Sequence, residues 1–145
     1  MTAYAYVQYD SCMNIMFSRI AEQFGLTLII QFGSTVKGSR GPMSDVDVFM
    51  HGSRELAPEE EAGLRAALAE ALAAAEERID PVFLRRANAL LAYEALWHGK
   101  LLWGDVETLH ELQVRAWKRL QEERKFAGRR RAFIQAAIRQ PSPAV

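Results

Sequence analysis

Three aspartates are the residues of this sequence whose type and spacing could do chemistry together. Asp45 and Asp47 are two positions apart in an alternating apolar segment, so on a strand both side chains leave the same face. Asp80 lies between Ile79 and Pro81 in another strand-like segment, where a carboxylate needs a partner. If the two strands lie side by side, the three carboxylates meet, and their repulsion calls for a cation. Oxygen ligands suit Mg²⁺, and two such ions, roughly 3.5–4 Å apart, would clamp the attacking and leaving oxygens of a phosphoryl transfer.

The turn before these aspartates offers candidate phosphate ligands. Phe32 ends an apolar strand-like run, and Gly33 and Ser34 follow it as the start of a tight loop or helical turn. Free backbone N–H groups at such a turn bind anions, and glycine lets a phosphate approach closely. Ser34 adds a hydroxyl donor and Lys37 a positive charge. The spacing of turn and aspartates, between two strands, favours a nucleotide-binding site.

The elements that must position these residues follow from apolar periodicity and from turn residues. The predicted order is helix 12–24, strand 26–32, loop 33–44, strand 45–50, helix 57–76, strand 78–84, helix 88–98, a short apolar stretch 101–103, a helical pattern 106–139 and a tail 141–145. Pro81 cannot donate a ladder hydrogen bond, which predicts that its strand lies at a sheet edge. Gly128 is the candidate point for a break in the last helix. The order predicts an α/β (α+β) fold, a small mixed β-sheet flanked by helices.

The loop and the first two aspartates together form the pattern G-S-x3-G-x5-S-D-x-D, from Gly33-Ser34 through Gly38 to Ser44-Asp45 and Asp47. This pattern resembles the nucleotidyltransferase superfamily related to DNA polymerase β, specifically its minimal nucleotidyltransferase (MNT) branch. The stretches 79–82, 90–94 and 99–102 are also similar to that branch. The resemblance is strong over 32–49, moderate to about residue 105 and weak beyond it.

The resemblance implies a polymerase β-like fold and a set of roles for the site residues. Gly33 and Ser34 would hold the nucleotide phosphates, with Lys37 and Ser44 completing the nucleotide-binding set. The metal ligands and catalytic residues would be Asp45, Asp47 and Asp80. The implied reaction transfers AMP from ATP to a hydroxyl with two Mg²⁺ ions. In the antitoxin branch the acceptor is a tyrosine of a HEPN ribonuclease toxin, which makes that toxin the expected partner in a hetero-oligomer.

Composition excludes several other classes of protein. The 145 residues include 18 Lys and Arg and 18 Asp and Glu, and this neutral balance argues against a dedicated nucleic-acid binder. One cysteine, Cys12, forms no internal disulfide, and its helical neighbours suggest a small core residue. The sequence contains no signal-peptide pattern and no apolar run long enough to span a bilayer. By elimination we expect a cytoplasmic protein with no membrane or direct nucleic-acid partner.

The length predicts one nucleotidyltransferase domain over 1–140, with a catalytic core at about 10–105 and a helical extension at 106–140. Because only about 40 residues follow Asp105, a partner protein is expected to supply the surface that holds the acceptor. An antitoxin that AMPylates its toxin is the leading hypothesis. Two alternatives stay open: an antitoxin that neutralises its partner by docking alone, and an adenylyltransferase of small molecules such as aminoglycosides.

The last predicted helix is basic along much of its length. Its basic residues are Arg115, Lys118, Arg119, Arg124, Lys125 and Arg129 to Arg131, and only Glu122 and Glu123 offset them within this run. This pattern is typical of a solvated helical face. It is also compatible with a docking surface for an acidic partner or an RNA-bound toxin.

Overall fold

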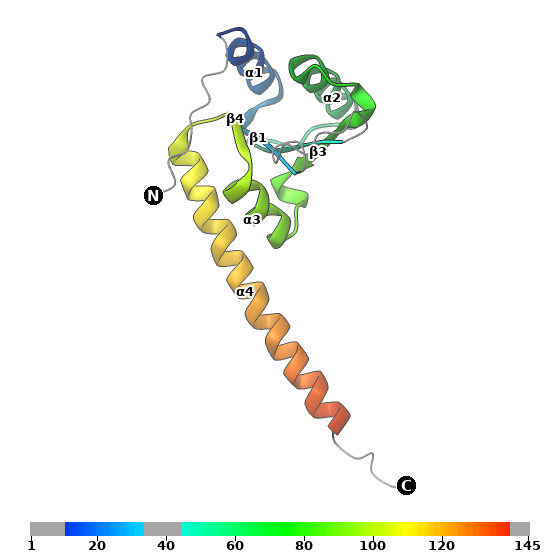
Figure 1. Ribbon diagram of the computed structural model, residues 1–145, viewed down its shortest axis with the longest axis vertical. Helices are drawn as coiled ribbons and strands as arrows, with labels where there is room; N and C mark the ends of the chain where they lie inside the picture. Colours follow the sequence, from blue (N-terminus) through cyan, green and yellow to red (C-terminus); the bar gives the residue numbers. More distant parts are fainter. Residues whose placement is uncertain (1–10, 34–44, 140–145) are drawn as a thin grey trace.

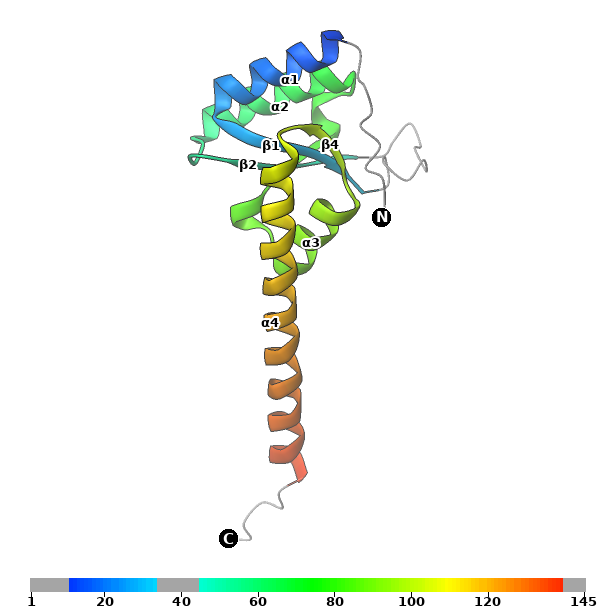
Figure 2. The ribbon, with the colours of Figure 1, turned by 90° about the vertical axis from the view of Figure 1, so that its left-hand side faces the viewer.

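The computed structural model describes residues 11–33 and 45–139, and these residues form helices on both faces of a four-stranded sheet (Figures 1 and 2). In chain order the elements are α1 (Ser11–Phe24), β1 (Leu26–Phe32), β2 (Val46–Gly52), α2 (Pro58–Leu72), β3 (Ile79–Phe83), α3 (Ala89–His98), β4 (Lys100–Trp103) and α4 (Val106–Arg139), with short 3-10 turns at Glu76–Arg78 and Leu84–Arg86. The predicted mixed sheet flanked by helices is therefore confirmed.

The sheet has the strand order β3-β2-β1-β4. β1 pairs antiparallel with both β2 and β4, whereas β2 and β3 are parallel. A parallel neighbour requires a crossover connection, and α2 provides it between β2 and β3. β3 is an edge strand, as Pro81 predicted, because only an edge position tolerates the missing N–H donor.

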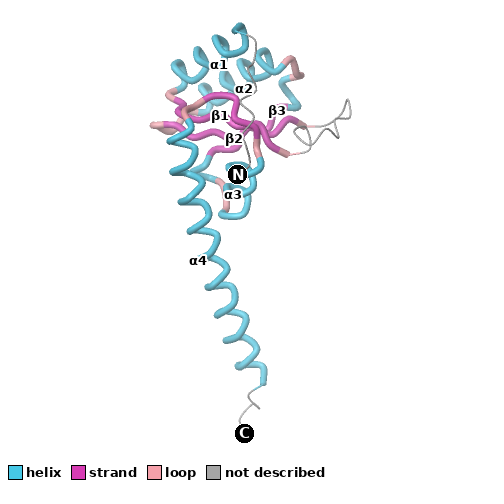
Figure 3. Tube along the Cα trace, turned by 60° about the vertical axis from the view of Figure 1, so that its left-hand side comes forward, coloured by secondary structure: helices cyan, strands magenta, loops and turns pink. Residues whose placement is uncertain are grey.

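Two apolar layers hold the helices onto the sheet, and successive residues of β2 alternate between them. Val46, Val48 and Met50 face the layer that contains α1 and α2, while Phe49 faces the layer of α3 and α4. Figure 3 shows the sheet between the two sets of helices. The face of β2 that carries Phe49 is also the face of Asp45 and Asp47, because these positions differ by even numbers.

α2 ends earlier than predicted. Pro58 and three glutamates begin it, as the preference for proline and negative charge at a helix N-terminus predicts. The helix stops at Leu72, because Ala73 adopts a left-handed conformation with φ of 51°. Its N–H donates to the carbonyls of Ala69 and Glu70. The predicted continuation to Glu76 is wrong, since the high helix propensity of the alanines does not prevent this C-terminal turn.

The segment after α3 is a strand, which the sequence analysis described only as a short apolar stretch. Asn88 caps α3 as predicted, and its side chain accepts a hydrogen bond of 2.8 Å from the backbone N–H of Leu91. Residues Lys100–Trp103 then pair with β1 and form the second edge of the sheet. A four-residue strand is too short for its alternation to be recognised in the sequence.

α4 is one uninterrupted helix of 34 residues, so the break considered at Gly128 is not present. Its first half packs on the sheet and on α3 through Leu109, Leu112, Ala116 and Leu120. Beyond Gln121 every described residue is exposed, and Figures 1 and 2 show this half extending away from the rest of the molecule. A Cβ on Gly128 would meet no atom within 4 Å.

Cys12 is exposed at the start of α1, so its predicted place in the core is wrong. The buried side chains of this helix lie further along it, at Phe17, Ile20, Ala21 and Phe24. No helix among the described residues is long and apolar enough to cross a membrane.

Candidate active site

The three predicted aspartates lie at one end of the sheet, where β1 ends and both β2 and β3 begin. Antiparallel pairing places Phe32 opposite Asp47, and parallel pairing places Asp47 opposite Asp80. Asp45 directly precedes β2 on the same face as Asp47. Asp47 is half-buried, while Asp45 and Asp80 are exposed to solvent. The sheet thus brings together two carboxylates that are 33 positions apart in the chain.

The electrostatics of Asp47 show that these carboxylates interact. Burial raises the pKa of Asp47 above its ordinary value, and the negative charges of Asp80 and Asp45 raise it further. A hydrogen bond between the side chains of Asp47 and Asp80 contributes to the same pKa shift, since it forms only when one carboxyl is protonated. A cation beside these carboxylates would favour the charged form of Asp47 and offset the repulsion.

Gly33 lies against the central aspartate of this cluster. Its φ of 86° is in the left-handed region, where side chains other than glycine are strained. A Cβ at this position would overlap the Oδ2 atom of Asp47. The sequence analysis assigned Gly33 to the close approach of a phosphate. The structure adds a second reason for glycine, because only glycine leaves room for the Asp47 carboxylate beside the turn.

The remaining predicted nucleotide ligands lie outside the described residues. Ser34, Lys37 and Ser44 belong to the segment 34–44, as does Gly38 of the sequence pattern. Among the residues that the structure does describe, no group of three His, Cys, Asp or Glu side chains is arranged to hold a metal ion. The geometry brings Asp47 and Asp80 into contact, and Asp45 acts on Asp47 through its charge.

The chemistry of the donor set nevertheless fits a hard divalent cation. All candidate ligands are carboxylate oxygens, which Mg²⁺ prefers, and Mg²⁺ usually takes only one or two protein carboxylates together with substrate phosphates. The raised pKa of Asp47 marks the repulsion that such an ion would relieve.

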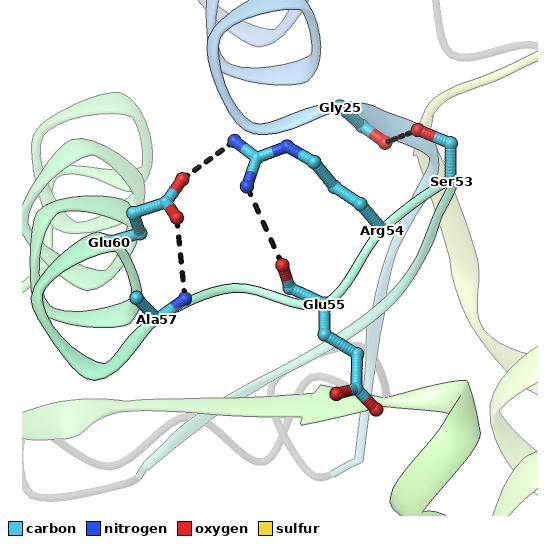
Figure 4. A network of polar contacts seen from close by, with 6 residues as sticks. All are labelled: Gly25, Ser53, Arg54, Glu55, Ala57 and Glu60. Atoms are coloured by element: carbon cyan, nitrogen blue, oxygen red, sulfur yellow. Dashed lines mark hydrogen bonds and ion pairs between the residues drawn. The ribbon is translucent and has the colours of Figure 1, made fainter.

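The opposite end of β2 carries a second group of charged residues, which anchors the loop between β2 and α2. A shallow hollow there is lined by His51, Arg54, Glu55, Arg85 and Arg86, among others. Arg54 pairs with Glu60 at 2.6 Å, and Ala57 donates its N–H to the same carboxylate at 3.3 Å (Figure 4). This ion pair and the contact of Ser53 with Gly25 account for the position of the loop.

His51 lies in the same hollow and is half-buried. Its Nδ1 atom is buried and has no hydrogen-bond partner among the described residues. Burial lowers the pKa of His51, and the charges of Arg85 and Arg115 lower it further. A neutral imidazole four residues along β2 from Asp47 contributes no positive charge to the candidate site.

Comparison with known proteins agrees with this arrangement. Residues 18–108, more than half of the chain, match the model of the family described as polymerase beta, nucleotidyltransferase. The chain therefore belongs to the polymerase beta nucleotidyltransferase family. No curated protein matches the chain.

Several solved structures share the fold. One is a toxin–antitoxin crystal structure with AMP-PNP, with a TM-score of 0.64 and 24% identity over 86% of this chain and 98% of that chain. A second is a mutant of the toxin–antitoxin MntA-HpeT, with a TM-score of 0.62 and 23% identity over 86% and 98%. A third contains the tri-AMPylated HEPN toxin of Shewanella oneidensis in complex with an MNT antitoxin, with a TM-score of 0.58 and 22% identity over 88% and 97%.

Proposed function

We propose that this protein is an antitoxin that transfers AMP from ATP to a hydroxyl of a partner protein, a tyrosine of a HEPN-type toxin. The observation that carries the proposal is the meeting of Asp47 and Asp80 beside the Gly33 turn, with Asp45 close enough to affect the pKa of Asp47. Membership of the nucleotidyltransferase family supports the transfer of a nucleotidyl group.

The proposed reaction is a displacement at the α-phosphorus of ATP. The acceptor oxygen forms a bond to the α-phosphorus, the bond from that phosphorus to the bridging oxygen breaks, and pyrophosphate leaves. The hydroxyl proton passes to a carboxylate of the site or to water. Mg²⁺, held by Asp45, Asp47 and Asp80, would supply charge neutralisation for the phosphates and lower the pKa of the acceptor hydroxyl.

In this proposal the site residues divide these tasks by position. The Gly33 backbone N–H at the end of β1 would bind a phosphate, and the Ser34 hydroxyl, Lys37 and Ser44, which lie outside the described residues, would complete the nucleotide-binding set. Asp47 on β2 and Asp45 directly before it would hold the nucleotide's cation. Asp80 comes from the exposed edge strand β3, where an acceptor can approach from solvent, so it serves the acceptor side of the reaction.

The choice of a protein acceptor is supported by the solved structures with the same fold. One holds an ATP analogue together with a toxin–antitoxin pair, and another holds an AMPylated HEPN toxin with its MNT antitoxin.

Co-expression with the protein encoded beside this chain, which the proposal expects to be of the HEPN type, tests the function directly. Intact-mass spectrometry of that protein should show added AMP units with the wild-type chain and none with the Asp47→Asn variant. Neutralisation of the toxin without any added mass would favour docking alone. Adenylylation of an aminoglycoside, with the neighbour unchanged, would favour the small-molecule alternative.

A further inference from the structure

The outer half of α4, residues 122–139, is a helix with no tertiary support. Every side chain from Glu122 to Arg139 is exposed, and Figure 2 shows this half continuing in line beyond the body of the protein. We refer to it as the α4 arm. It contains four large apolar side chains that remain in solvent: Phe126 at 65%, Phe133 at 76%, Ile134 at 49% and Ile138 at 77% relative exposure.

These apolar side chains lie on one side of the arm. Phe133 follows Phe126 by seven residues, and Ile138 follows Ile134 by four. Ile134 follows Phe126 by eight, so all four side chains lie on one broad helix face. Ala127 and Ala137 belong to the same face. At helical spacing this face continues that of Ala116 and Leu120, the residues with which the inner half of α4 packs on the body of the protein. The arm therefore extends an existing packing surface beyond the protein's own core.

The other side of the arm is strongly basic. Residues 124–139 contain six basic side chains and no acidic one, so the remaining residues carry 12 basic against 18 acidic side chains. With Glu122 and Glu123 included, the arm carries a net charge of +4, and the rest of this neutral chain carries −4. Arg129 lies on the face opposite Ile134. Arg131 lies at the border of the apolar face, three residues from Ile134 and seven from Ile138, and Arg130 lies within that face, between Phe126 and Ile134.

A helix of this composition is not stable by itself in water. Most helical stability in proteins comes from tertiary packing of an apolar face, and the arm has no such packing. Gly128 in the interior lowers helix stability by about 1 kcal/mol, and the like charges of Lys125 and Arg129 at i,i+4 add repulsion. No glutamate follows Glu123 in the arm, so no acidic side chain offsets that repulsion beyond this point. A partner that covers the apolar face and neutralises the charge would stabilise the helix.

We infer that the α4 arm is the docking helix for the acceptor protein, and that it lies in an apolar groove of that protein that is bordered by acidic side chains. This inference rests on the proposed function. Three features favour a protein groove. Two phenylalanines and two isoleucines need an apolar counterpart, which a nucleic-acid duplex does not offer. Arg130 within the apolar face is unsuited to the acyl region of a membrane, and two arms, each with a net charge of +4, repel one another.

The test compares three full-length proteins for binding to the separately purified HEPN-type partner by isothermal titration calorimetry. The arm variant combines Phe126→Ser, Phe133→Ser and Ile138→Ser. Its matched control places the same number of serines on the basic face, as Ala132→Ser, Gln135→Ser and Ala136→Ser. All six positions are exposed, so neither variant removes a contact of the core. A third protein carries Arg129→Glu and Arg131→Glu.

We expect the arm variant to bind at least tenfold more weakly, as removal of central apolar anchors does at protein interfaces. The control should bind within about twofold of wild type, because its changes are on the other face. The charge variant should bind more weakly at low salt than wild type, and this difference should shrink as salt increases. Circular dichroism at 222 nm should show a gain of helix when the wild-type complex forms.

The inference is wrong if the arm variant binds the partner as tightly as wild type. It is also wrong if the arm variant keeps its affinity for the partner but loses one of three other properties of the wild-type protein. These are binding to anionic lipid vesicles, binding to an RNA oligonucleotide, and a dimer detected by light scattering. The Asp47→Asn variant separates this inference from the proposed function. If that variant binds the partner through the arm and wild type transfers no AMP, docking stands and the proposed reaction fails. If AMP transfer occurs with unchanged affinity in the arm variant, the reaction stands and the docking helix fails.

Discussion

At the scale of single residues, Asp47 links the fold to the chemistry. It pairs with Phe32 of β1 on one side and Asp80 of β3 on the other, and its carboxylate occupies the space beside Gly33. Its pKa is raised by burial and by two neighbouring negative charges. These surroundings disfavour the ionised form of Asp47, and the ionised carboxylate in turn lowers the stability of the metal-free fold. Such an arrangement is typical of sites that a ligand completes.

Replacement of Asp47 by Asn should abolish AMP transfer and stabilise the metal-free protein. The raised pKa means that the ionised carboxylate destabilises the fold at neutral pH, and this penalty disappears as pH falls through the raised pKa toward the ordinary value of 3.8. Asparagine removes the charge, so the melting temperature in EDTA at pH 7 should rise. Added MgCl₂ should stabilise wild type and leave the variant unchanged.

If MgCl₂ raised the melting temperature of the variant as much as that of wild type, Asp47 would not belong to the metal site. Glu22→Gln on the exposed side of α1 is the control and should change neither quantity.

The Gly33→Ala substitution should weaken ATP binding and lower stability together. The left-handed φ alone costs about 1–2 kcal/mol for alanine, and the new Cβ would displace the Asp47 carboxylate. Calorimetric titration of ATP and thermal melting measure the two effects. Gly63→Ala in α2 is the matched control, because its Cβ would make only ordinary contacts with Phe24, and the helix should become more stable by about 0.5–1 kcal/mol. If Gly33→Ala behaved like Gly63→Ala, the phosphate site would lie elsewhere.

Asp80→Asn should separate nucleotide binding from catalysis. Asp80 is exposed on the edge strand, while Asp45 and Asp47 lie together with Gly33 at the proposed phosphate site. We expect Mg²⁺–ATP to bind with affinity within about threefold of wild type, whereas the transfer rate should fall to about 1% or less, the scale of losing one contact to developing charge. Lost ATP affinity would instead assign Asp80 to the nucleotide's ion, and normal transfer would exclude it from catalysis.

At the scale of elements, a side-chain cap defines the start of α4. Asp105 begins α4, and its carboxylate accepts hydrogen bonds from the Thr108 backbone N–H at 2.8 Å and from the Thr108 hydroxyl at 2.7 Å. These hydrogen bonds lower the pKa of Asp105. β4 immediately precedes this cap, so the start of α4 also determines where β4 turns away from β1.

The stabilisation by Asp105 should depend on pH in a direction that follows from its lowered pKa. The contribution is present above the ordinary value of 3.8 and is lost as pH falls through the lower pKa of the folded state. Asp105→Ala should therefore melt at a lower temperature than wild type at pH 7, with a difference that shrinks below pH 3.8. Asp105→Asn keeps a capping oxygen without the charge and serves as the control, with a smaller and less pH-dependent change. A pH-independent difference for the alanine variant would show that the ionised cap contributes nothing.

At the scale of the whole molecule, α4 divides into a half that belongs to the core and a half that does not. A chain that ends at Lys125 should keep the melting temperature of the full-length protein in the absence of a partner, because the residues removed make no core contact. Leu120→Ala in the full-length chain should cost about 2–5 kcal/mol, since Leu120 is buried. Thermal and urea unfolding of both proteins check this difference. A large loss of stability in the truncated chain would mean that the α4 arm supports the fold without any partner.

The sequence by itself determined the residue types of the site and the faces on which they lie. Alternation along β2 placed Asp45 and Asp47 on the face opposite Val46 and Val48, because a strand repeats every two residues. Pro81 determined that β3 is an edge strand, since it has no N–H donor. These properties are local, so they can be derived from neighbours in the chain.

Only the tertiary structure decided which of these local features meet. The pairing of Asp47 with Asp80 depends on the crossover through α2, and its parallel register is set by packing of that helix on the sheet. The overlap between a Cβ on Gly33 and Asp47 depends on the register of β1 with β2. The strand β4, the exposure of Cys12 and the unsupported half of α4 were decided in the same way, because burial depends on contacts between segments distant in sequence.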